Sequence, residues 1–129
     1  MAQKNNRKDI PVFSGVFKYF PLALMEIAKC SLQGQKQHNP DKPLAWDREK
    51  SSDELDALSR HLLEAGTVDD DGILHDTKIA WRSLANLQKV LEEKERDEKW
   101  IVEQYNRNRL PHDQIISGTE IAYIKDEKK

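Results

Sequence analysis

The sequence predicts an all-α fold, a single helical bundle built from 129 residues. Hydrophobic residues make up 37% of the chain and charged residues 34%, so a core must come from a few strongly patterned segments. Such segments follow Ser51 and Ile73, where apolar residues recur at helical spacing. We divide the chain into a flexible N-terminus (1–9), a helical domain (10–109) and a C-terminal arm (110–129).

The first helix is expected over residues 21–33, because Pro21 suits a first helical position and Gly34 a C-terminal stop. Residues 10–20 carry aromatic side chains on both sides of a Ser-Gly pair, which indicates an irregular arm. The helix is apolar nearly all round, as in a buried helix. Its polar stripe consists of Glu26, Lys29 and Gln33.

Residues 35–50 contain two prolines and are expected to form a long ordered loop. A second helix should open at Ser51, which has capping-box spacing to Glu54, and end near Ala65, before Gly66. One face of this helix is apolar and the opposite face is polar. The apolar face carries Leu55, Leu58 and Leu62, and the polar face carries Asp53, Asp56, Arg60 and Glu64.

After a turn over 67–72, a third helix is expected from about Ile73 to about Arg109. Its buried side is predicted to hold Ile79, Trp81, Leu84, Leu87, Val90 and Leu91, and its polar stripe His75, Lys78, Arg82 and Asn86. The mixed charges after Lys89 indicate a solvated face, and the apolar residues that begin at Trp100 indicate contact with another subunit. Residues 110–129 allow a short β-hairpin or an extended arm.

Composition excludes several classes of protein. A net charge of −2 argues against a nucleic-acid partner. Cys30 is the only cysteine, so neither a disulfide framework nor a thiolate zinc site is expected. No apolar stretch reaches the roughly 18 residues that span a bilayer, and the first eight residues are polar. We therefore expect a cytoplasmic protein without a membrane partner.

Acidic side chains form the first candidate site, since Mg²⁺ and Mn²⁺ prefer carboxylate oxygens. Asp53 and Asp56 lie one helical turn apart, and Glu26 stands on an otherwise apolar helix. The remaining acids are Asp69, Asp70 and Asp71 in the turn. Helix capping, ion pairs of Asp56 with Arg60 or of Glu26 with Lys29 or Arg60, and ordinary turn chemistry explain the same residues.

Basic and polar side chains form the second candidate, a phosphate site. It comprises His75, Lys78, Arg82 and Asn86, joined from the loop by Lys36, His38 and Asn39. Trp46 and Trp81 offer surfaces for stacking on a base. Solvated helix surface and ordinary core anchors remain alternatives. His61 with His75-Asp76 also resembles the pattern of His-Asp phosphohydrolases, but the interval is short and a further aspartate is not clearly placed.

The order of residues over roughly 9–92 resembles the dATP/dGTP diphosphohydrolase family of tailed phages. Three motifs carry the resemblance: the loop QHNP-x-x-PL-x-W, the helix S-x-D-x-x-D-A-L-x-RHL, and the helix D-x-DG-x-x-H-x-x-K-x-AWR-x-LA. This family looks like a branch of the MazG-like all-α pyrophosphatases. The resemblance implies a MazG-like helical bundle that cleaves purine deoxynucleoside triphosphates, dGTP or dATP, into the monophosphate and pyrophosphate. Some phage members supply dGMP as the precursor of 2-aminoadenine.

The resemblance also implies roles for individual residues. MazG-like enzymes bind magnesium through Glu-x-x-Glu and Glu-x-x-Asp, which appear here as Glu26-Ile-Ala-Lys29 and Asp53-Glu-Leu-Asp56. Asp56 matches the family's metal-binding aspartate unchanged. Lys29 stands where the family has an acidic ligand, and Asp70 or Asp71 is the candidate to replace that ligand. The implied catalytic residues are Glu26 and Asp56, the implied metal ligands Glu26, Asp53, Asp56 and Asp71, and the implied nucleotide or phosphate contacts Lys29, Lys36, His38, Asn39, Trp46, Arg60, His75, Lys78, Arg82 and Asn86.

From this we expect two or three Mg²⁺ or Mn²⁺ ions and a bound water that attacks the α-phosphorus in line. The small bundle makes a shallow cleft, so a dimer or tetramer is expected. A His-Asp type triphosphohydrolase and a non-catalytic helical interaction module are the alternatives.

Overall fold

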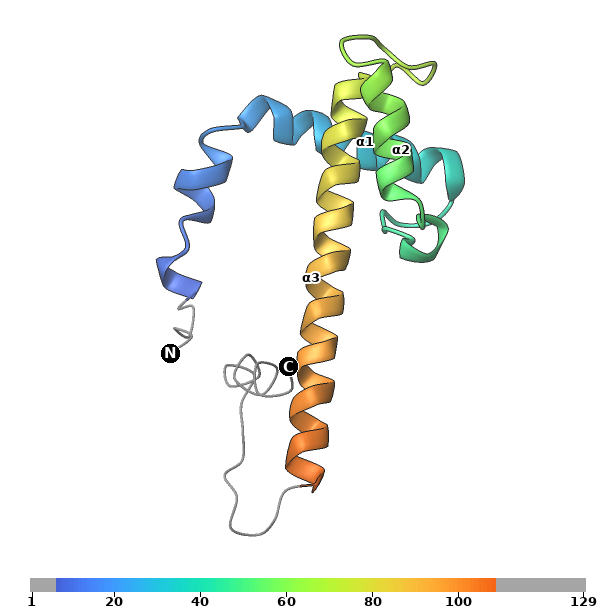
Figure 1. The fold of residues 1–129 in the computed structure, drawn as a ribbon. Helices are drawn as coiled ribbons and strands as arrows, with labels where there is room; N and C mark the ends of the chain where they lie inside the picture. The colour runs from blue at the N-terminus through green and yellow to red at the C-terminus, as the bar shows by residue number, and fades with distance from the viewer. Residues whose placement is uncertain (1–6, 109–129) are drawn as a thin grey trace. The chain divides into compact units, whose positions relative to one another are not determined.

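The computed structural model describes residues 7–108, and over these residues the fold is all-α (Figure 1). No strand occurs among them, and Val68 and Leu74 form an isolated antiparallel bridge. The elements are a 3₁₀ turn η1 (Arg7–Asp9), a π-helical segment η2 (Phe13–Phe17), α1 (Pro21–His38), a 3₁₀ turn η3 (Arg48–Lys50), α2 (Glu54–Leu63) and α3 (His75–Asn108). Most of the predicted flexible N-terminus, 1–6, and the predicted C-terminal hairpin or arm lie outside the described residues.

The described residues fall into two groups. Residues 11–88 form one compact unit that contains α1, α2 and the beginning of α3. The second group contains residues 7–10 and 89–108, so the continuous helix α3 passes from one group into the other. The candidate site lies wholly within residues 11–88.

Helix α1 begins at Pro21 as predicted but ends at His38, so the prediction of a stop at Gly34 is wrong. A glycine inside a helix costs only about 0.5–1 kcal/mol, and Gly34 does not have the positive φ of a helix-terminating glycine. The next residue, Gln35, holds the chain after the helix. Its side-chain amide donates to the carbonyl oxygens of Asn39, at 2.6 Å, and Lys42, at 3.0 Å.

The arm before α1 is more regular than expected, because residues 13–17 form π-helical turns. Phe13 and Phe17 stack on the same side of this segment, with ring centroids 6.4 Å apart. Its last turn is followed by Lys18, whose backbone N–H donates to the carbonyl oxygen of Phe13 at 2.9 Å.

Helix α2 starts at Glu54, three residues later than predicted, because Asp53 is its N-cap residue. Ser51 and Glu54 do interact, but through their side chains and not as a capping box. The helix ends at Leu63, and Gly66 then adopts a φ of 85° that other residues rarely tolerate. A compact turn follows, closed by hydrogen bonds from the Gly72 N–H to the Asp69 oxygen and from the His75 N–H to the Thr67 oxygen.

Helix α3 begins at His75 and ends at Asn108, close to the predicted bounds. Its first turns lie beside α2, where Arg82 approaches Glu54, and against α1, where Trp81 meets Ser31 (Figure 1). These contacts bring the three helices of residues 11–88 together.

The predicted burial of the apolar faces is not found in the single chain. Ala57 and Ala85 are the buried apolar residues among those described, and no large side chain there is fully buried. Helix α1, expected to be buried, has no buried residue. In the predicted apolar faces of α2 and α3, more than half of the residues are exposed, because the helices of the described residues are too few to cover them. Exposed members include Leu55, Leu62, Leu84, Leu87, Val90 and Leu91.

Among the described residues, no single helix has both the length and the apolar composition of a membrane span. Only Arg7–Phe17 and Pro21–His38 taken together, as a bent pair, match a span in length and composition.

Candidate phosphate-binding pocket

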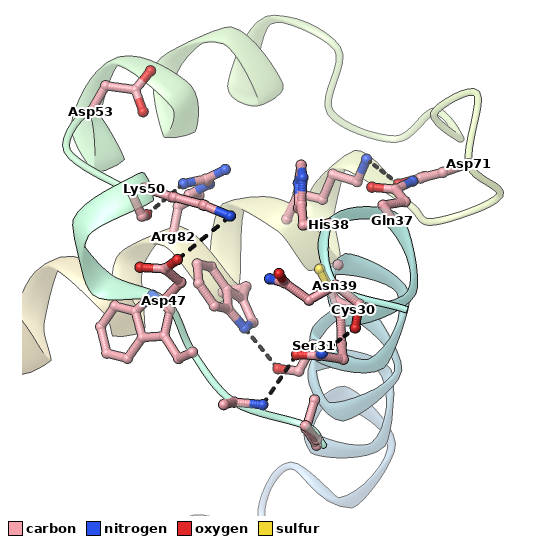
Figure 2. Close-up of a pocket in the computed structure, with 18 of the residues that line it drawn as sticks. Cys30, Ser31, Gln37, His38, Asn39, Asp47, Lys50, Asp53, Asp71 and Arg82 are labelled. Atoms are coloured by element: carbon pink, nitrogen blue, oxygen red, sulfur yellow. Dashed lines mark hydrogen bonds and ion pairs between the residues drawn. The ribbon is translucent and has the colours of Figure 1, made fainter. Parts of the chain in front are cut away.

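A pocket of about 440 Å³ lies between α1, the loop that follows it, and the first turns of α3 (Figure 2). The second half of α1 supplies Cys30, Ser31, Gly34, Gln35, Gln37 and His38. The loop supplies most of the opposite wall, from Asn39 to Asp53. His61, Asp71, Lys78, Trp81 and Arg82 complete the lining.

Two indole rings form an ordered wall of this pocket. Trp46 and Trp81 meet edge to face, with ring centroids 5.7 Å apart. The indole N–H of Trp81 donates to the Ser31 hydroxyl at 2.8 Å, which ties α3 to α1. The guanidinium of Arg48 lies over the Trp46 ring at 4.3 Å. These contacts fix the orientation of both rings.

Lys78 is the most deeply placed cation of the pocket, with 16% of its side chain exposed. Its ammonium donates to the Asp69 carboxylate at 2.5 Å and to the Asp71 carboxylate at 2.7 Å. Burial alone would lower the pKa of Lys78, but the two carboxylates outweigh burial and raise its pKa. The hydrogen bond from Lys78 in turn lowers the pKa of Asp69. The three groups therefore stay charged together.

Arg82 joins α3 to the start of α2. Its guanidinium donates to the Ser51 hydroxyl at 3.0 Å and lies 3.5 Å from the Glu54 carboxylate. The Ser51 hydroxyl also donates to Glu54, whose side chain is only 5% exposed. Sequence reasoning assigned Glu54 to helix capping and missed this role, although the spacing to Ser51 had already singled out the pair.

The other charged groups of the pocket are also paired. Lys50 approaches Asp47 at 3.6 Å (Figure 2). Asp53 accepts a hydrogen bond from Arg60 at 2.8 Å, and this bond lowers the pKa of Asp53. The lining thus contains Lys50, Lys78 and Arg82 as cations and Asp47, Asp53 and Asp71 as acids. Equal numbers of opposite charges leave the wall close to neutral.

Half of the residues to which the resemblance assigns a catalytic, metal-binding or nucleotide-binding role line this pocket. They are His38, Asn39, Trp46, Asp53, Asp71, Lys78 and Arg82. The others do not line it: Glu26, Lys29, Lys36, Asp56, Arg60, His75 and Asn86. The end of α1, the loop, the turn and α3 therefore contribute these residues together, while the acidic residues most favoured as catalytic groups lie elsewhere.

Glu26 pairs with Lys29 at 2.5 Å on the partly exposed side of α1, as the ion-pair alternative predicted. Asp56 is exposed on α2. Asp53 and Asp56 do not act as one helical acidic pair, because Asp53 is the N-cap residue and its φ and ψ of −120° and 38° are not helical. Among the described residues, the predicted ligands Glu26, Asp53, Asp56 and Asp71 form no group of three or more that is close enough to share one metal ion.

His75 is buried and does not line the pocket. Its ring lies against that of His61, with 2.9 Å between the two Nδ1 atoms. Burial, the nearby Lys78 and His75 lower the pKa of His61. Asp76, the other member of the His-Asp pattern, accepts the backbone N–H of Gly66 at 2.6 Å.

Comparison of the chain with family models, with curated proteins and with solved structures finds no match in any of the three. The resemblance to phage diphosphohydrolases therefore stays a prediction.

Proposed function

We propose that the protein is a divalent-metal-dependent pyrophosphohydrolase of purine deoxynucleoside triphosphates. The observation that carries this proposal is a single pocket that combines fixed cations, carboxylates and an aromatic wall. Lys78 and Arg82 suit phosphate oxygens, and the Trp46–Trp81 wall suits a base. The proposed substrates, dGTP and dATP, occur in the cytoplasm, where we propose that the protein acts.

The charge balance of the pocket supports dependence on a metal. A triphosphate carries several negative charges, whereas the cations of the wall are already matched by carboxylates. Divalent cations would remove this mismatch by binding both the carboxylates and the phosphate oxygens. Asp53 and Asp71 offer oxygen ligands of the kind that Mg²⁺ and Mn²⁺ prefer. Free nucleotide should therefore bind far more weakly than its metal complex.

In the proposed reaction, water attacks the α-phosphorus and pyrophosphate leaves with the bonding electrons. A bound divalent cation would supply a water of lowered pKa. The chain's own contribution is positional and electrostatic. Lys78 and Arg82 would stabilise the charge that develops on the leaving pyrophosphate, and their carboxylate partners hold both cations in place.

The full-length chain should be assayed with dGTP, dATP and the ribonucleotides, with Mg²⁺, with Mn²⁺ and without metal. The proposal expects pyrophosphate and the nucleoside monophosphate as products. Tripolyphosphate and free nucleoside would instead support the His-Asp type of triphosphohydrolase. Absence of turnover together with absence of any metal-dependent nucleotide binding would support a non-catalytic interaction module.

Lys78→Met tests the site directly. Loss of one positioned transition-state donor reduces kcat by about 10²–10³-fold, and we expect a decrease of this size. Lys99→Met is the matched control, because Lys99 pairs with Glu95 on an exposed face of α3 and does not line the pocket. Equal activity of the two variants would refute the assignment of the pocket.

We also propose that the chain self-associates as a dimer or tetramer. Support comes from residues 7–108, where no large side chain is fully buried and apolar residues stay exposed on α1 and α2. Leu22 is 82% exposed and Leu63 89% exposed. Size-exclusion chromatography with light scattering should give at least twice the chain mass, and Leu63→Glu should lower it. A wild-type monomer at micromolar concentration would contradict the proposal.

A further inference from the structure

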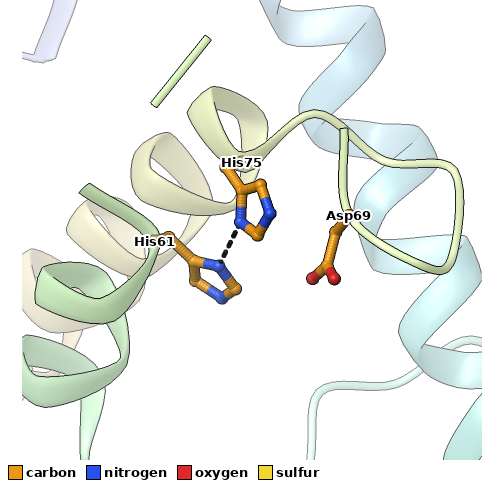
Figure 3. Close-up of side chains that lie close together, drawn as sticks. All are labelled: His61, Asp69 and His75. Atoms are coloured by element: carbon orange, nitrogen blue, oxygen red, sulfur yellow. Dashed lines mark hydrogen bonds between the residues drawn. The ribbon is translucent and has the colours of Figure 1, made fainter. Parts of the chain in front are cut away.

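Three potential metal ligands meet beside the pocket, at the junction of α2, the following turn and α3 (Figure 3). His61 comes from α2, Asp69 from the turn, and His75 is the first residue of α3. One ligand atom from each lies within 4.8 Å of the other two. Among the histidine, cysteine and acidic side chains of the described residues, His61, Asp69 and His75 form the group of three or more that is compact enough to hold one ion.

We propose that His61, Asp69 and His75 bind a divalent transition-metal ion of the Zn²⁺ type. Imidazole nitrogen is a preferred ligand of Zn²⁺, Co²⁺ and Ni²⁺, whereas Mg²⁺ prefers oxygen. The site is thus chemically different from the carboxylates that we propose for Mg²⁺. It does not depend on the proposed hydrolase activity, because ion binding can be measured without any nucleotide.

Binding of an ion requires movement of all three side chains. Two nitrogens that are each about 2.05 Å from a tetrahedral ion lie about 3.3 Å apart. The Nδ1 atoms of His61 and His75 are 2.9 Å apart and share a hydrogen bond, so the ion must displace the shared proton and both rings must turn until their nitrogens face the ion. The ligand atoms of the three residues all lie within 4.8 Å of one another, so Asp69 must approach by at most about 1.5 Å.

The surroundings of His75 suit a ligand. Its Nε2 atom lies 3.6 Å from the Glu64 carboxylate, on the side of the ring opposite the Nδ1 atom that faces His61. Metal-binding imidazoles commonly direct their second nitrogen toward such a carboxylate, which orients the ring. His75 is also buried, so the ring has little freedom to turn away.

Lys78 does not prevent Asp69 from binding an ion. One Asp69 oxygen accepts from Lys78 and the other accepts the Asp70 backbone N–H at 2.7 Å. A carboxylate has about four lone-pair positions, so capacity for a ligand bond remains. Lys78 also keeps its second carboxylate, Asp71, at 2.7 Å.

Three protein ligands leave the fourth position of a tetrahedral ion open, as in catalytic and not in structural zinc sites. His61 and Lys78 both line the pocket, so the ion would border the groups proposed to bind phosphate. A water molecule or a phosphate oxygen can occupy the open position.

The test is a titration of the metal-stripped full-length chain with Co²⁺ in excess Mg²⁺, followed by visible absorption, with Zn²⁺ added afterwards as the competitor. We expect one Co²⁺ per chain, displaced by Zn²⁺. His61→Ala and Asp69→Asn should each weaken binding by more than the roughly 10–100-fold that loss of an outer partner costs. Glu64→Gln should weaken it by about 10-fold.

His38→Ala is the matched control, because His38 lines the pocket but does not belong to the cluster. Circular dichroism of each variant separates loss of a ligand from loss of the fold, and Asp69→Asn in the turn covers the case in which His61→Ala unfolds. Lack of binding by the wild-type chain, binding that survives in both ligand variants, or equal loss in His38→Ala would overturn the proposal.

Discussion

The contact between Arg82 and Glu54 should be the most sensitive ion pair of the described chain. Glu54 is 5% exposed and Arg82 29% exposed, so removal of the guanidinium leaves a carboxylate with little access to water. Ser51 can still donate its hydroxyl to Glu54, but it carries no charge. Arg82→Ala therefore removes one charged partner of a buried carboxylate.

Breaking a buried ion pair by removal of one partner costs 3–5 kcal/mol. Because nearly a third of Arg82 is exposed, we expect a value at the lower end, about 3 kcal/mol. Arg60→Ala is the matched control, since Arg60 pairs with Asp53 while both side chains are at least half exposed. Its free energy of unfolding should change little, because solvent screens an exposed pair.

Urea unfolding at one fixed protein concentration measures both values, and the fixed concentration matters if the chain self-associates. Addition of Glu54→Gln to the Arg82→Ala variant should recover part of the lost stability, because the buried charge that lost its Arg82 partner disappears. If Arg82→Ala destabilises no more than Arg60→Ala, or if Glu54→Gln lowers the stability of Arg82→Ala further, the burial argument is wrong.

Three further predictions concern Cys30 and two glycines. Burial raises the pKa of the Cys30 thiol, only partly offset by Lys78, so at pH 8 iodoacetamide should alkylate the native chain more slowly than the urea-unfolded chain by mass spectrometry. A native rate equal to the unfolded rate would refute the burial of Cys30. Gly66 has a φ of 85°, so Gly66→Ala should lower the free energy of unfolding by about 1–2 kcal/mol. At Gly34 nothing lies within 4 Å of an added Cβ, so Gly34→Ala should raise the free energy of unfolding by about 0.5–1 kcal/mol. A lower free energy of unfolding in urea would contradict this.

The limits of the helices could be predicted where they depend on the backbone preferences of a single residue. Pro21 and Gly66 act through their own backbone preferences, and both mark helix limits as expected. Gly34 failed as a signal because a glycine ends a helix only where the chain turns away, which depends on Gln35 and the loop that it holds. Burial failed for a different reason: helical periodicity predicts an apolar face but not the surface that covers it.

Residues predicted to share one helix face do lie close together in the structure. Lys78 and Arg82 are four residues apart, and both line the pocket. Contacts between distant segments could not be read from spacing. His61 approaches His75 across the turn between α2 and α3, and Asp69, not Asp76, lies beside them. Both contacts depend on how that turn closes.

The positions of Glu26 and Asp56 lead to one more prediction. Both lie outside the pocket and belong to no compact group of possible ligands among the described residues. If they serve the proposed hydrolysis, a second copy of the chain must bring them to a shared site. Glu26→Ala and Asp56→Ala would then each be inactive, and each would lack a different half of that site.

Co-expression of the two variants with different tags distinguishes the possibilities. In a dimer whose sites take Glu26 from one copy and Asp56 from the other, random pairing restores about a quarter of the wild-type sites. Two inactive variants that stay inactive together would mean that both residues come from the same copy. Single variants with wild-type activity would remove Glu26 and Asp56 from the mechanism, and the pocket carboxylates Asp53 and Asp71 would remain as the proposed ligands.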